Sequence, residues 1–123
     1  MSKYHAVKTT IDGITFDSKI EAHRYQDLVI LQKAGLIKDL KVHPKFVLLE
    51  PFEYRGQKIG AITYTADFQY VATNLFNHYS FSEVVVEDVK GVRTAVFNVK
   101  WKLAKFKYPS ITWRLNNGKE VYE

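Results

Sequence analysis

An apolar run in the sequence ends in two acids and a lysine, in the order Val84-Val85-Val86-Glu87-Asp88-Val89-Lys90. The valines favour a buried strand, and side chains on a strand alternate between its two faces. We therefore expect Asp88 and Lys90 on one face of this strand and Glu87 on the other. Because a buried charge is costly unless it is paired, a carboxylate and an amine held together here indicate a chemical role.

Two more acids stand at defined positions earlier in the chain. Asp67 lies within residues 61–71, whose alternation of apolar and polar side chains predicts a strand, although aspartate is disfavoured in strands. It is either an exposed residue on a solvated face or part of a site. Glu21 follows Ser18 by three residues, the spacing of a capping box at a helix start. It is either the capping partner of Ser18 or a carboxylate directed at a metal site. Both roles can hold in part, although one side chain cannot fill both at once.

The order of these residues favours hydrolysis of a phosphodiester bond. Two carboxylates and a main-chain carbonyl form the hard oxygen site that Mg²⁺ prefers, and Mg²⁺ also takes phosphate oxygens as ligands. Such an ion acidifies a water and stabilises the charge that develops on phosphorus. Lys90, which shares the face of Asp88, would orient or deprotonate that water or neutralise the phosphate. The Asp-x-Lys pattern is common by chance, so it does not establish this activity alone.

The charge of the chain is concentrated towards its C-terminal end. The formal net charge is +5, yet residues 1–88 hold 10 Lys/Arg and 11 Asp/Glu, whereas residues 89–119 hold eight basic residues and no acid. A basic segment beside a carboxylate pair suits a polyanion held next to metal ions. The alternative is a solvated lysine face that binds nothing.

Composition excludes several classes of protein. The chain has no Cys, which excludes disulfides and thiolate zinc sites, and its four histidines lack the spacing of a histidine metal cluster. No stretch approaches the roughly 20 apolar residues of a membrane span, and the N-terminus lacks the apolar core of a signal peptide. We expect a cytoplasmic protein with no membrane contact, folded as a single domain over residues 1–123.

Two helices are predicted. A helix over residues 18–34 follows from the capping box and from the stop signal at Gly35. A second helix, over residues 95–107, has Thr94 as its cap and an apolar stripe with the spacing i, i+4, i+7 and i+11. The stripe consists of Phe97, Trp101, Ala104 and Tyr108. Lysines fill much of the rest of this helix, which fits DNA backbone contact, a membrane surface or plain solubility.

The remaining segments predict strands and turns. Residues 61–71 and 81–90 are expected to pair as a hairpin around a polar turn over 72–80, which would bring Asp67 near Asp88. The other predicted elements are a hairpin of 8–10 against 14–16, a strand or connector over 36–42, a strand over 45–49, a turn within 51–58 and a last strand over 111–115.

Two segments of the chain resemble the signature of the PD-(D/E)XK nuclease superfamily. They are Tyr-Thr-Ala-Asp-Phe at 64–68 and Val-Val-Glu-Asp-Val-Lys-Gly at 85–91. The order of elements is similar to phage endonuclease I and to archaeal Holliday-junction resolvases, and most similar to a small phage-encoded family of unknown function. Ala66 stands where the superfamily has proline. The doublet Glu87-Asp88 leaves two candidate acids, of which the spacing to Lys90 selects Asp88.

The resemblance implies an α/β (α+β-like) fold in which helices flank a central mixed β-sheet, as in restriction endonucleases, with the site at one edge. Asp67, Asp88 and the main-chain carbonyl of Val89 would bind Mg²⁺ or Mn²⁺, Glu21 would be the helix acid, and Lys90 would serve the water. Branched or duplex DNA would contact the second helix and the loop before it, and a homodimer is expected. The predicted DNA contacts are Arg93, Lys100, Lys102, Lys105 and Lys107.

Three functions follow. The first is a metal-dependent DNA endonuclease, directed at branched or junction DNA in phage recombination or replication. The alternative is a module that keeps the nuclease fold and binds nucleic acid without cutting it. The third is a structural or partner-binding phage protein whose lysine face is incidental.

Overall fold

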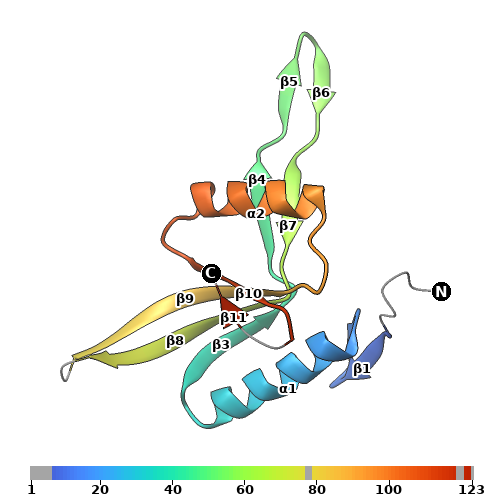
Figure 1. Ribbon diagram of the computed structural model, residues 1–123. Helices are drawn as coiled ribbons and strands as arrows, with labels where there is room; N and C mark the ends of the chain where they lie inside the picture. The colour runs from blue at the N-terminus through green and yellow to red at the C-terminus, as the bar shows by residue number, and fades with distance from the viewer. Residues whose placement is uncertain (1–6, 77–78, 119–120, 123) are drawn as a thin grey trace.

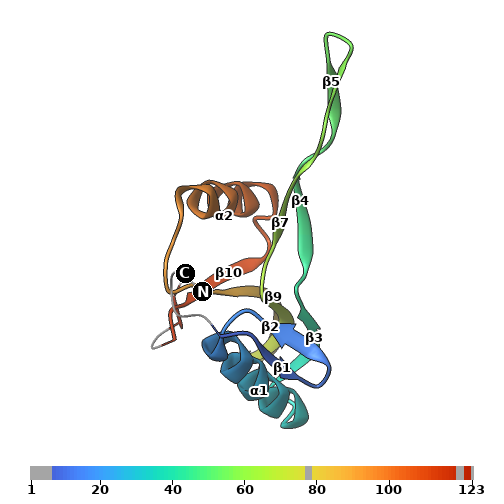
Figure 2. The ribbon, with the colours of Figure 1, turned by 90° about the vertical axis from the view of Figure 1, so that its right-hand side faces the viewer.

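The computed structural model describes residues 7–76, 79–118 and 121–122. Its main sheet has five strands: Ile37–Val42 (β3), Phe68–Phe76 (β8), Tyr79–Val89 (β9), Thr112–Asn116 (β10) and Val121–Tyr122 (β11). The strand order is β11-β10-β9-β8-β3, with β9 and β10 parallel and the other neighbours antiparallel. The sheet lies between two helices (Figure 1, Figure 2). The predicted class, a mixed sheet flanked by helices, is confirmed.

Helix α1, Lys19–Lys33, has both of the ends that the sequence predicts. At its start the Ser18 hydroxyl accepts the Glu21 N–H at 3.2 Å. At its end Gly35 adopts a φ of +79°, and its N–H and that of the next residue bond to carbonyls of the last helical turn. This termination favours glycine because other residues are strained at positive φ.

Helix α2, Ala95–Lys107, connects the parallel strands β9 and β10. Parallel neighbours need such a crossover because a tight turn cannot join strands that run in the same direction. Thr94 caps the helix, with its hydroxyl accepting the Phe97 N–H at 3.0 Å. The predicted apolar stripe faces the sheet. Within the described parts of the chain, neither helix is long and apolar enough to cross a membrane.

The sheet separates two apolar clusters, and β9 contributes alternate residues to them. Val85 packs on the α1 side, and Val86 packs on the α2 side. By the same alternation Glu87 belongs to the α1 side and Asp88 to the α2 side. The α1-side cluster includes Phe16, Leu28 and Phe68, and the α2-side cluster includes Tyr64, Trp101 and Trp113.

Residues between β3 and β8 form a two-stranded arm that extends away from the sheet beyond α2 (Figure 1, Figure 2). Its strands are Lys45–Leu49 (β4), Phe52–Tyr54 (β5), Gln57–Ile59 (β6) and Ile62–Thr65 (β7). β4 pairs with β7 at the base, and β5 pairs with β6 further out. The predicted turn within 51–58 is confirmed at Arg55 and Gly56, whose φ values of +48° and +80° suit a tight hairpin turn. The short strands beside it were not predicted.

A smaller hairpin precedes α1. It pairs Thr9–Ile11 (β1) with Ile14–Phe16 (β2) around a turn at Asp12 and Gly13, both at positive φ. The predicted hairpin is therefore confirmed, with its first strand one residue later in the chain than expected.

The prediction of one strand over residues 61–71 is wrong, as is the polar turn over 72–80. The chain forms β7, leaves strand structure at Ala66 and Asp67, and continues as β8, because β7 pairs in the arm while β8 pairs in the sheet. β8 and β9 then pair from Phe68 opposite Glu87 as far as Phe76 opposite Tyr79. The expected hairpin exists, with longer strands.

The outer face of α2 is apolar, which the sequence analysis did not predict. Its exposed residues repeat at intervals of three, four and three: Val96, Val99, Leu103 and Phe106. Since successive helical residues are 100° apart, Lys100 and Lys107 flank this stripe on one side and Lys102 and Lys105 on the other. The lysines therefore frame an apolar surface instead of covering the helix.

Replacing Trp101 by alanine tests the two faces of α2. Trp101 is 3% exposed and contacts the rings of Tyr64 and Trp113, so Trp101→Ala should lower the free energy of unfolding by about 3–5 kcal/mol. Phe106, which is 85% exposed on the same helix, gives the matched control, and Phe106→Ala should change stability by less than about 0.5 kcal/mol. Urea denaturation measures both. Similar losses for the two variants would contradict the assigned faces.

Candidate active site

Glu87 has a structural role, despite its place beside Asp88. It is fully buried on the α1 side, where Arg24 donates to its two oxygens at 2.5 and 2.8 Å. The Tyr70 hydroxyl and the Asn116 amide donate at 2.9 and 3.2 Å. Burial and the Glu87 charge raise the pKa of Tyr70 to about 12, which keeps this hydroxyl a donor. Four hydrogen bonds and one counter-charge satisfy the carboxylate.

Asp88 has the opposite environment on the α2 side, where it is 1% exposed. The Tyr64 hydroxyl donates to its Oδ2, and burial, followed by the Asp88 charge, raises the pKa of Tyr64 well above its usual range. Its Oδ1 is buried and has no hydrogen-bond partner among the described residues. The nearest cation is the Lys90 ammonium, 3.6 Å from that oxygen. A buried carboxylate oxygen without a donor is rare in proteins, so Asp88 is a candidate ligand for a cation.

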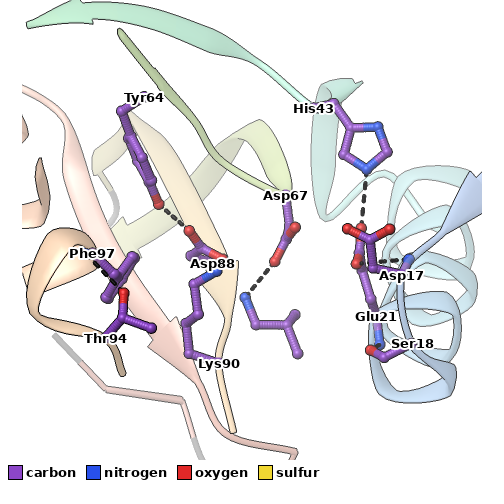
Figure 3. A network of polar contacts seen from close by, with 11 residues as sticks. Asp17, Ser18, Glu21, His43, Tyr64, Asp67, Asp88, Lys90, Thr94 and Phe97 are labelled. Atoms are coloured by element: carbon purple, nitrogen blue, oxygen red, sulfur yellow. Dashed lines mark hydrogen bonds and ion pairs between the residues drawn. The ribbon is translucent and has the colours of Figure 1, made fainter. Parts of the chain in front are cut away.

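Asp67 lies at the bend between β7 and β8, next to Asp88 (Figure 3). Its Oδ2 accepts the Val89 N–H at 2.6 Å, and its main-chain oxygen accepts the His43 N–H at 2.9 Å. Burial raises the pKa of Asp67 well above its usual range, and contact with Asp88 and the charge of Glu21 raise it further. Two touching carboxylates do not both stay ionised unless a cation lies between them.

The main chain of Val89 directs a carbonyl oxygen to the same place. The Lys90 N–H donates to the Asn116 carbonyl on β10 at 2.9 Å. A trans peptide points the preceding C=O the opposite way, and the described part of the chain contains no cis peptide bond. The Val89 carbonyl is therefore directed away from β10, towards the side on which the Val89 N–H meets Asp67, as a main-chain metal ligand requires.

Glu21 and His43 complete the group from the α1 side (Figure 3). Glu21 is 4% exposed, its Oε2 accepts the Asp17 N–H at 3.3 Å, and its Oε1 lies 3.0 Å from the His43 Nε2. Its two oxygens therefore have different partners, with Oε2 at the start of α1 and Oε1 at His43. One ligand atom each from Glu21, His43 and Asp67 lie within 4.8 Å of one another.

His43 and Tyr64 are the residues of this site that the sequence analysis missed. His43 was set aside because the spacing of the histidines does not fit a histidine metal cluster. It follows the last residue of β3, and the turn there brings its ring to Glu21. The signal that marks this turn is the pair His43-Pro44, since a proline disfavours helix in the residue before it and often follows a strand end. Tyr64 is a buried residue of β7 whose hydroxyl reaches Asp88, and the sequence analysis gave it no role in the site.

Two cations lie near the N-terminal end of α2, and one of them, Lys90, is beside Asp88. The Lys90 ammonium lies 5.0 Å from the centre of the Phe97 ring, and the Arg93 guanidinium lies 5.9 Å from it. Lys90 shares the α2 side with Asp88, as alternation predicts. The other predicted DNA contacts follow along the helix: Lys100, Lys102, Lys105 and Lys107, the last 3.7 Å from a Glu50 carboxylate oxygen.

The formal charges of the group do not balance. When ionised, Glu21, Asp67 and Asp88 carry three negative charges, and Lys90 carries one positive charge. A neutral His43 leaves an excess of two negative charges in a largely buried place. One divalent cation would neutralise that excess, whereas Glu87, with its own arginine, needs none.

Removing the charge of Asp67 should stabilise the metal-free protein. A carboxyl whose pKa is raised on folding costs stability at pH values above its unfolded pKa of about 4. Asparagine keeps an oxygen for the Val89 N–H and offers an amide donor to Asp88. In EDTA, Asp67→Asn should raise the free energy of unfolding by roughly 1 kcal/mol at pH 8, and the gain should shrink as the pH falls towards 4.

Thermal and urea unfolding at several pH values measure this gain. Asp27→Asn, at an exposed position of α1, is the control and should have little effect. A loss of stability in Asp67→Asn at pH 8 would mean that the two carboxylates do not repel each other as described.

Comparison with known proteins gives a family and no activity. The family model described as "Protein of unknown function (DUF1064)" matches residues 1–120. No curated protein and no solved structure matches the chain. The chemistry of the site therefore rests on its own geometry.

Proposed function

We propose that this chain, which belongs to the DUF1064 family of proteins of unknown function, is a metal-dependent endonuclease that hydrolyses phosphodiester bonds in DNA. The observation that carries the proposal is the contact of Asp67 with Asp88 at the end of β9. One buried Asp88 oxygen lacks a hydrogen bond within the described residues, and Lys90 lies 3.6 Å from it. Perturbed, unsatisfied charge of this kind gathers at functional sites.

The residues present fit a divalent ion. The carboxylates of Asp67 and Asp88 and the carbonyl of Val89 are hard oxygen ligands, which Mg²⁺ prefers and Mn²⁺ accepts. The excess of two negative charges matches the charge of the ion. Once bound, the ion would supply positive charge to a phosphate group and acidify a neighbouring water.

The chain's own residues would divide the remaining work. Asp67 and Asp88 would hold the cation, which would supply its positive charge to the scissile phosphate. Lys90, 34% exposed, is placed to hydrogen-bond the attacking water or a phosphate oxygen and so stabilise the charge of the transition state. Tyr64 is a positioning residue, because its hydroxyl fixes the orientation of the Asp88 carboxylate. The Glu21 carboxylate would line the site on the α1 side.

The arrangement of elements supports the same proposal. The acid-x-Lys strand β9 lies inside the mixed sheet, α1 supplies a carboxylate from its first turn, and the basic helix α2 begins beside the site. This order is compatible with the PD-(D/E)XK nuclease core that the sequence resembles.

DNA is the substrate that the charge distribution favours. Lys90 lies at the site, Arg93 lies against Phe97 in the first turn of α2, and the lysines of α2 extend the positive charge along the helix. A phosphate backbone would therefore follow α2. On this proposal the protein acts in the cytoplasm, that of the host if it is phage-encoded.

The expected homodimer stays a prediction. The apolar outer face of α2 offers a surface for a second copy. The lysines that flank this face count against such a dimer, because they would repel the same lysines of the second copy.

Asp88→Asn tests the catalytic assignment. The substitution removes the charge and keeps the shape, so the protein should fold and bind DNA. Its cleavage of supercoiled plasmid and of four-way junction DNA with Mg²⁺ or Mn²⁺ should fall by at least about 100-fold. Gel assays measure the rates, and Asp27→Asn should cut at the wild-type rate.

Cleavage by the Asp88→Asn protein at the wild-type rate would show that the nuclease centre lies elsewhere. Wild-type protein that retains branched DNA and never cuts it with either ion would instead favour a module that binds without cutting.

The lysines of α2 should set the salt dependence of DNA binding. If Lys100 and Lys102 contact phosphates, changing both to Gln should reduce the slope of log K against log salt concentration by about 1.8, at about 0.9 per contact. The same change at the exposed residues Lys33 and Lys38, at the other end of α1 from Glu21, is the control. Fluorescence anisotropy with a labelled duplex measures the slopes. An unchanged slope in the α2 variant would place the DNA on another surface.

A further inference from the structure

We infer a second cation site beside the first, formed by Glu21, His43 and Asp67, that binds Mn²⁺ in preference to Mg²⁺. The proposed cleavage chemistry needs only the oxygens of Asp67, Asp88 and Val89. The second site adds an imidazole nitrogen to the ligand set, and its existence does not depend on whether the chain cuts DNA.

Three elements bring the ligand atoms together (Figure 3). Glu21 comes from the first turn of α1, His43 from the residue after β3, and Asp67 from the residue before β8. Their ligand atoms lie within 4.8 Å of one another, and the Glu21 Oε1 and His43 Nε2 are 3.0 Å apart. Ligands 2.0–2.3 Å from one ion lie roughly this far apart.

Each ligand is fixed by a contact that does not involve the ion. The Glu21 Oε2 accepts the Asp17 N–H, which leaves Oε1 for the site. The His43 N–H donates to the main-chain oxygen of Asp67, and its ring lies 6.0 Å from that of Phe16. Supporting contacts of this kind hold metal ligands in place in known sites. The His43 side chain is 39% exposed, which gives an ion a path from solvent.

The ligand chemistry sets the preference. Mg²⁺ takes oxygen ligands almost exclusively, whereas imidazole suits first-row transition ions, of which Mn²⁺ is the one that also accepts carboxylates readily. The first site, formed by Asp67, Asp88 and the Val89 carbonyl, offers only oxygen ligands. A strong preference for Mn²⁺ over Mg²⁺ would therefore indicate that His43 binds the ion. The competing explanation is a protonated His43 paired with Glu21, which predicts no such discrimination.

Direct metal binding to the tag-free, full-length protein at pH 8, without DNA, tests the inference. Isothermal titration should show that Mn²⁺ binds at least about tenfold more tightly than Mg²⁺, and His43→Asn should remove that preference. Asparagine suits this position because it tolerates the φ of +57° that His43 adopts, and it offers an oxygen in place of the nitrogen. His23→Asn, on an exposed face of α1, is the control and should keep the preference.

Electron spin-echo spectroscopy of the wild-type protein with Mn²⁺ gives a readout that needs no variant. Coupling of the ion to a ¹⁴N ligand is expected. Its absence, or an unchanged preference in folded His43→Asn protein, would overturn the inference.

The outcome is separable from that of the proposed nuclease. Asp88→Asn keeps all three ligands and should keep the Mn²⁺ preference while losing cleavage. A Mn²⁺ preference that depends on His43, in a protein that never cuts DNA, would contradict the proposed nuclease activity and support this second cation site. Cleavage of DNA with Mg²⁺, together with no nitrogen coupling to bound Mn²⁺, would support the nuclease and contradict the second cation site.

Discussion

The contact between the carboxylates of Asp67 and Asp88 is the constraint on which the rest of the site depends. Paired strands β8 and β9 fix the distance between them, and the apolar clusters on both sides of the sheet fix the strands. Without a cation, folding leaves a proton shared between two buried acids or an excess of negative charge, and either state costs stability. The metal-free fold therefore carries this cost at the contact between Asp67 and Asp88.

The neighbouring residues Glu87 and Asp88 lie on opposite faces of β9 and have opposite environments. Alternation turns Glu87 towards α1, where four donors hold it and where Arg24 and Asn116 link the helix to β10 through it. The same alternation turns Asp88 towards α2, where one oxygen has no donor among the described residues. The satisfied acid ties the strand end to α1, β8 and β10, and the unsatisfied acid follows it by one residue.

The mixed α/β class followed from the resemblance to the PD-(D/E)XK nuclease superfamily. Local periodicity was enough to predict both helices with their caps and the faces of Glu87, Asp88 and Lys90. It failed where a segment changes partners. The alternation of Tyr64, Ala66, Phe68 and Tyr70 runs unbroken through the sequence, yet the chain bends after Ala66, and the first two side chains join one cluster while the last two join the other. A period-two pattern carries no information about which sheet a strand joins.

Other features depend on tertiary contacts, which the spacing of residues along one sequence does not reveal. His43 reaches Glu21 through the pairing of β3 with β8, across elements that are distant in sequence. The outer apolar stripe of α2 was hidden because a helix with two apolar faces gives a weak amphipathic signal. The sequence left the two roles of Glu21 open, because the separate partners of its oxygens are visible only in three dimensions.

Anomalous scattering from crystals soaked in Mn²⁺ tests the central claim most directly. The account predicts a strong anomalous peak between the carboxylates of Asp67 and Asp88, within bonding distance of an oxygen from each. Well-diffracting soaked crystals in which no anomalous peak lies within bonding distance of both carboxylates would contradict it.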